Sequence, residues 1–87
     1  MTALDEERCR ALVGKLCSGL GWSVCPAPAV RYVLFDRTGR WITFGQSMVD
    51  VVESLCGPWT ADPGEAPAWM LECSSPEELA LKIEVAL

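Results

Sequence analysis

The stretch that decides the fold is residues 30–45, which read VRYVLFDRTGRWITFG. Two apolar runs, rich in β-branched and aromatic residues, flank the short polar segment Arg37-Thr38-Gly39-Arg40. Glycine within that segment accepts a positive φ at little cost, as a tight turn between strands requires. The pattern predicts a β-hairpin.

A two-residue turn at Thr38-Gly39 would determine which side chains share a face, because successive side chains of a strand point to opposite sides. The predicted core face consists of Val33, Phe35, Ile42 and Phe44, and it is fully apolar apart from Arg31 at its end. The other face is predicted to be left to solvent or to a partner, and it carries Tyr32, Leu34, Trp41 and Met70. A bulged or longer turn would shift the register by one residue and exchange the two faces.

Helices are predicted on both sides of the hairpin, over residues 3–20, from Gln46 or Ser47 to Cys56, and over residues 76–87. Each shows apolar residues at three- and four-residue spacing. Thr2 is the expected N-cap of the first helix, and Gly19 and Gly21 end it. The last helix has the clearest local signal, because Ser75 caps it, Pro76 takes its first position and Glu78 completes a capping box.

The third strand is predicted at residues 68–73, where Trp69, Leu71 and Cys73 alternate with Met70 and Glu72. Residues 25–28, with two prolines, are expected to form an extended connector. The predicted element order is therefore α-β-β-α-β-α, in a single domain over residues 1–87. This order indicates an α+β two-layer sandwich, with a small three-stranded, mainly antiparallel sheet and helices packed on it.

The composition is that of a small globular protein, since half of the 87 residues are hydrophobic and four are tryptophan. The first residues lack the basic start and apolar run of a signal peptide, and no apolar run approaches the ~20 residues needed to span a bilayer. We therefore expect a cytoplasmic protein with no membrane contact. Its five cysteines are expected to be reduced thiols and not metal ligands, because no C-x-x-C pair and no histidine accompany them.

The sequence offers little to a catalytic mechanism. Histidine, the usual acid or base at neutral pH, is absent, which excludes Ser-His and Cys-His nucleophile pairs within this chain. The close carboxylate pairs, Asp50/Glu53 and Glu77/Glu78, have ordinary roles as a solvated helix face and an N-terminal cap. No glycine-rich phosphate loop is present. We therefore expect no enzymatic activity and no cofactor.

The charge is negative and unevenly placed. The net charge is −5, and residues 46–87 carry eight acids against Lys82 alone. Arg31, Arg37 and Arg40 lie on the hairpin but are too few for the basic stripe that nucleic acid requires, so direct nucleic-acid binding is not expected. The acidic half either only keeps the protein soluble or steers it onto a partner with a basic surface.

These observations favour a small acidic, non-enzymatic protein that binds another protein and inhibits or regulates it. Nuclease-immunity proteins, antitoxins and phage anti-defence proteins such as anti-CRISPRs share this general character, as a class and without a sequence match. The candidate partner-binding residues are Tyr32, Trp41, Asp50, Glu53, Trp59, Asp62 and Glu65. Two alternatives remain open: a structural or assembly module acting as a homodimer, and a small-molecule-binding domain.

Overall fold

The computed structural model describes residues 4–56 and 67–87. Its elements follow the order α1 (Glu6–Leu20), β1 (Ser23–Ala27), β2 (Arg31–Phe35), β3 (Trp41–Gly45), α2 (Met48–Ser54), α3 (Ala68–Leu71) and α4 (Pro76–Ala86). The strands form one antiparallel sheet in the order β1-β2-β3. The predicted class, α+β with a three-stranded antiparallel sheet and helices packed on it, is confirmed.

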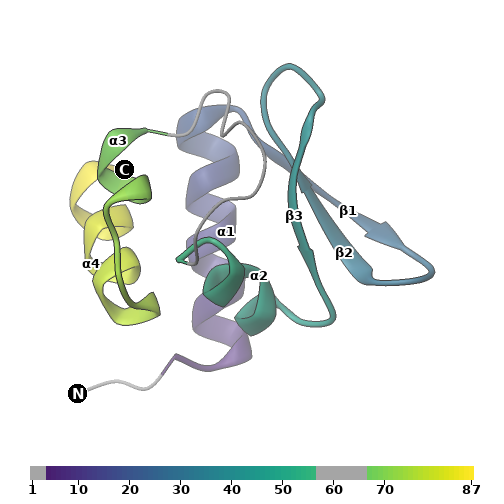
Figure 1. Ribbon diagram of the computed structural model, residues 1–87, viewed down its shortest axis with the longest axis horizontal. Coiled ribbons are helices and arrows are strands. Elements are labelled where there is room, and N and C mark those ends of the chain that lie inside the picture. The colour runs from purple at the N-terminus through teal and green to yellow at the C-terminus, as the bar shows by residue number, and fades with distance from the viewer. Residues whose placement is uncertain (1–3, 57–66) are drawn as a thin grey trace.

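The helices lie on one side of the sheet (Figure 1). Both α1 and α2 contact the strands, whereas α4 packs on α1 and α2 from the far side, and α3 packs on α4. The core between these elements is aliphatic. Its most completely buried side chains include Leu12, Leu16, Leu34, Val51, Leu55, Leu79 and Ile83.

The predicted position of the third strand is wrong. Residues 68–71 form the short helix α3, which begins directly after Pro67 and consists of the good helix formers Ala, Met and Leu together with Trp69. Six residues of alternating polarity are too few to separate a strand from a helix. The third strand is instead β1, in the stretch predicted to be a connector. Pro26 is tolerated there because β1 is an edge strand, where one row of N–H groups needs no partner.

The helix ends show which local sequence signals were sufficient to predict where a helix begins or stops. Asp5, rather than Thr2, caps α1: its carboxylate accepts a hydrogen bond of 2.8 Å from the backbone N–H of Arg8. Gly21 ends the helix in the left-handed region, with φ of 73°. The cap predicted at Ser75 before α4 is confirmed, and Ser47, one of the two predicted starts of the second helix, caps α2.

The predicted core face of the hairpin is wrong, although two of its strand pairs are right. Val33 pairs with Phe44 and Leu34 with Thr43, but a bulge follows and Phe35 pairs with Trp41. It is Leu34 that is fully buried against the helices, while Phe44 is half exposed. Val33, Phe35 and Phe44 of the predicted core face therefore turn outward, whereas Ile42 packs against the core. Of the face predicted to be open, Leu34 and Met70 are buried and Trp41 is exposed.

The turn explains the irregular register. The N–H of Asp36 donates to the carbonyl of Arg40 at 2.8 Å, which leaves a three-residue loop with Gly39 at φ of 89°. A three-residue loop displaces the strands by one residue relative to a two-residue turn. The bulge between Leu34 and Phe35 then restores the pairing farther along the hairpin.

Candidate functional site

Two aromatic rings are exposed on the outer face of the sheet. Trp41 is 54% exposed and Phe44 is 50% exposed, and their ring centroids lie 5.8 Å apart with the planes inclined by 56°. Residues three apart in a regular strand would point to opposite faces, so the bulge is what brings these rings together. The tilted geometry is favourable for two aromatic rings.

Most of the remaining outer face is also apolar, apart from the exposed Ser23 opposite Phe35 on β1. Val33 and Phe35 stand opposite the two rings on β2 and are half-buried, and the exposed Cys25 stands opposite Val33 on β1. We call the set formed by Cys25, Val33, Phe35, Trp41 and Phe44 the outer aromatic face. Contiguous exposed apolar surface on a small protein is typical of an interaction site.

A hollow of about 480 Å³ lies where β3 meets α2. Phe44 and the two exposed acids Asp50 and Glu53 are among the residues that line it. These two acids are three residues apart in sequence and therefore share one face of the helix. The other lining residues are Val30, Gly45, Gln46 and Ser54. The outer aromatic face thus continues directly into an acidic rim.

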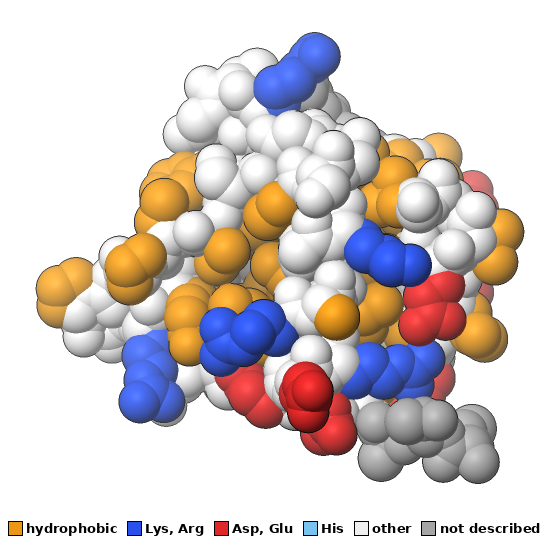
Figure 2. Space-filling view, turned by 180° about the vertical axis from the view of Figure 1, so that it is seen from behind, with side chains coloured by type: hydrophobic (Ala, Val, Ile, Leu, Met, Phe, Trp, Pro, Cys, Tyr) orange, Lys and Arg blue, Asp and Glu red, His pale blue; other side chains and the backbone are white. Residues whose placement is uncertain are grey.

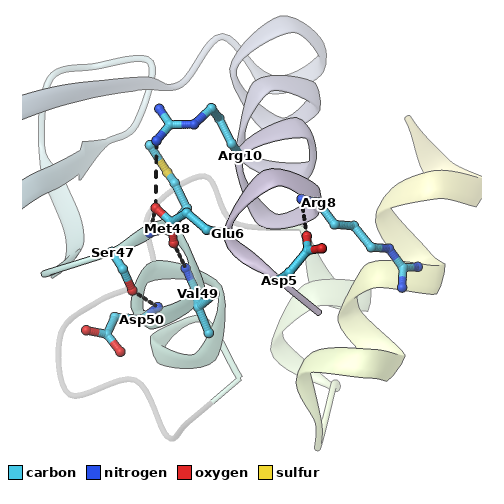
Figure 3. Close-up of polar contacts among 8 residues, drawn as sticks. All are labelled: Asp5, Glu6, Arg8, Arg10, Ser47, Met48, Val49 and Asp50. Atoms are coloured by element: carbon cyan, nitrogen blue, oxygen red, sulfur yellow. Dashed lines mark hydrogen bonds and ion pairs between the residues drawn. The ribbon is translucent and has the colours of Figure 1, made fainter. Parts of the chain in front are cut away.

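A carboxylate from α1 holds α2 in place (Figure 3). The side chain of Glu6 accepts hydrogen bonds from the backbone N–H groups of Met48 at 2.9 Å and Val49 at 3.2 Å. Arg10 lies 3.7 Å from the same carboxylate. A negative group at a helix N-terminus satisfies unpaired donors and is favoured by the helix dipole. Glu6 therefore fixes the first turn of α2, from which Asp50 projects.

The end of β3 is pressed against the same helix. A side chain at Gly45 would place its Cβ 2.8 Å from the Cβ of Asp50 and 2.9 Å from the backbone nitrogen of Val51. Only glycine permits this approach. The N–H of Gln46 also donates to the carboxylate of Asp50 at 3.3 Å. The hollow is consequently built on tightly packed backbone.

The other end of the hairpin is held by a buried acid. One oxygen of Asp36, which is 3% exposed, accepts hydrogen bonds from the hydroxyl of Thr38 at 2.7 Å and from the N–H groups of Thr38 at 2.9 Å and Arg40 at 3.1 Å. The hydrogen bond from the Thr38 hydroxyl is the main reason that the pKa of Asp36 lies below its ordinary value. The ionised form of Asp36 organises the turn.

The structure brings together three of the predicted partner-binding residues. Trp41 lies on the outer aromatic face, and Asp50 and Glu53 lie beside it across Phe44. Tyr32 is not part of this surface, because it is half-buried and packs against the core on the inner face. The remaining three predicted residues, Trp59, Asp62 and Glu65, lie outside the described residues.

Phe44 is the site residue that the sequence prediction assigned to the core. Phe44 is exposed because the helices cover the other face of the sheet. Its hydrophobicity alone would favour a buried position. The only sequence signal was the possibility of a longer turn, which exchanges the two faces.

Burial makes three of the five cysteine thiols poor nucleophiles. All five are free thiols. Burial raises the pKa of Cys56 to about 11 and also raises the pKa of Cys9 and Cys73, so these thiols stay protonated at neutral pH and are poor nucleophiles. Over residues 4–56 and 67–87, no group of three or more Cys, Asp or Glu side chains is placed to hold a metal ion.

Seen from behind, Lys and Arg side chains are spread from the top of the molecule to its lower edge and do not form one stripe (Figure 2). Within the described ranges, no helix has the length and apolar character needed to cross a membrane.

Comparison with known proteins finds no matching family model, no matching curated protein and no matching solved structure. The site therefore has to be interpreted from its own chemistry.

Proposed function

We propose that this protein is a small acidic, non-enzymatic binding protein that attaches to another protein and inhibits or regulates it, as immunity proteins, antitoxins and anti-CRISPRs do. The observation that carries the proposal is the exposed pair Trp41 and Phe44, in contact with each other and bordered by Asp50 and Glu53. Aromatic side chains on a rigid sheet are the typical energetic centre of a protein interface.

The acidic rim indicates the kind of partner. Carboxylates around an apolar centre raise the association rate with a positively charged surface and disfavour acidic partners. The chain also carries a net charge of −5, which strengthens long-range attraction to a basic protein. A partner with a basic surface, contacted by an aromatic centre, accounts for both features.

A homodimer is the second candidate, and the outer aromatic face is the observation that favours it. The face extends over all three strands, and two copies could cover it by packing against each other. Sedimentation at micromolar concentration separates the candidates. If the wild type is a dimer and the Trp41→Ala/Phe44→Ala variant is a monomer, self-association is favoured over the proposed hetero-partner.

The proposed function is tested by comparing two double variants as bait in lysate of the native host. Trp41→Ala/Phe44→Ala removes the centre of the outer aromatic face. Leu81→Ala/Val85→Ala is the matched control, because these side chains on α4 are 61% and 88% exposed and belong to a different surface. A captured protein that is lost only with the first variant, and whose purified form binds the wild type, is the expected result. Equal capture by both variants would contradict the proposal.

A further inference from the structure

The hollow between β3 and α2 combines an aromatic residue with two acidic ones. Its lining residues include Phe44, which is half exposed, and the exposed Asp50 and Glu53. Its volume, about 480 Å³, is ample for one long side chain. The base is formed by Gly45, whose backbone is packed against α2.

We propose that this hollow receives an arginine side chain from an extended segment of the partner protein. A guanidinium is planar and can stack on an aromatic ring while its N–H groups point outward to carboxylates. The ring and the two acids of the hollow offer both contacts at once. This inference rests on the proposed function, and it specifies which side chain of the partner is recognised.

The carboxylate of Asp50 retains the capacity to bind such a group. It already accepts one hydrogen bond, from the N–H of Gln46, but an ionised carboxylate offers about four acceptor positions. Figure 3 shows its oxygens pointing away from the Glu6 contact that holds the helix. Accepting a guanidinium therefore requires no rearrangement of α2.

Other occupants fit less well. An apolar side chain would bury Asp50 and Glu53 without a partner, which is costly. A lysine ammonium can pair with the acids, but it lacks the flat surface that stacks on Phe44. A nucleic acid or an acidic peptide would be repelled by the carboxylates.

The experiment is a titration of the wild-type protein with the peptide acetyl-Gly-Arg-Gly-amide at low salt, followed by backbone amide NMR. Matched peptides carry lysine or the neutral isostere citrulline in place of arginine. We expect saturable shifts confined to residues 44–54, with a Kd on the order of millimolar for so small a probe. The citrulline and lysine peptides should bind more weakly.

Two charge variants make the test specific. Asp50→Asn/Glu53→Gln keeps the shape of the hollow and should weaken the arginine peptide by about fivefold, the scale expected for exposed ion pairs. Glu72→Gln/Glu77→Gln removes the same charge from exposed positions elsewhere and should leave binding within about twofold, as for screened distant charges.

Several results would overturn the inference: shifts outside the hollow, no saturation, equal binding of citrulline or lysine, or an equal loss with the control variant. These outcomes are separable from failure of the proposed function. If Trp41→Ala/Phe44→Ala still abolishes capture of the partner while the arginine peptide does not bind, the protein-binding function stands and only the arginine site is lost.

Discussion

The two faces of one small sheet differ in a way that hydrophobicity does not explain. The inner face carries Leu34, fully buried, and continues to the buried carboxylate of Asp36. The outer face carries Trp41 and Phe44, each about half exposed. The more aromatic face is thus the open one. The positions of α1 and α2, and not the apolar content of the strands, determine which face of the sheet becomes core.

The largest loss of stability is expected when the central side chain of the inner face is removed. Leu34→Ala should lower the free energy of unfolding by about 2–5 kcal/mol, because it leaves a cavity between the sheet and the helices. Urea denaturation measures the change. A loss below about 1 kcal/mol, the scale of a surface substitution, would mean that Leu34 is not in the core.

The second test concerns the close packing of Gly45 against α2, on the inner face of the sheet. Gly45→Ala should cost about 1–3 kcal/mol, because the new methyl group would collide with the backbone of α2. Gly14→Ala is the control: no atom lies within 4 Å of its added Cβ, and alanine should stabilise the middle of α1 by up to about 1 kcal/mol. Opposite signs in thermal melting are expected, and equal signs would contradict the packing described.

A smaller effect is expected at the turn, and it depends on pH. The folded-state pKa of Asp36 lies below its ordinary value, so its stabilisation is complete above the unfolded pKa of about 3.9 and is lost as pH falls through the folded value. Asp36→Asn should therefore be less stable than the wild type between about pH 5 and 7. The difference should shrink below about pH 4. A constant difference down to about pH 2 would exclude the carboxylate as its source.

The smallest stability effects are expected on the outer face. Trp41→Ala and Phe44→Ala should each cost about 1 kcal/mol or less, since both residues are half exposed on the open face. The same variants should show the largest loss of partner binding. If Phe44→Ala instead destabilised the protein as much as Leu34→Ala, the assignment of the two faces would be reversed.

The hairpin and the three longer helices can be predicted from the sequence alone. The turn signal at Gly39, the cap at Ser75 and the helical spacing of apolar residues act over a few positions, so they can be seen without the fold. The same holds for the chemistry of the acidic half. The alternation at residues 68–73 was too short to resolve, and it became α3.

Only the tertiary structure decided which side of the sheet is covered. The bulge near Phe35 brings Trp41 beside Phe44, and the close approach of Gly45 to α2 sets the direction in which the chain leaves the sheet. Both faces of the hairpin are apolar enough to be core, so the choice depends on contacts between residues far apart in the chain, such as Glu6 with the start of α2. The candidate surface exists because that choice left two aromatic rings outside.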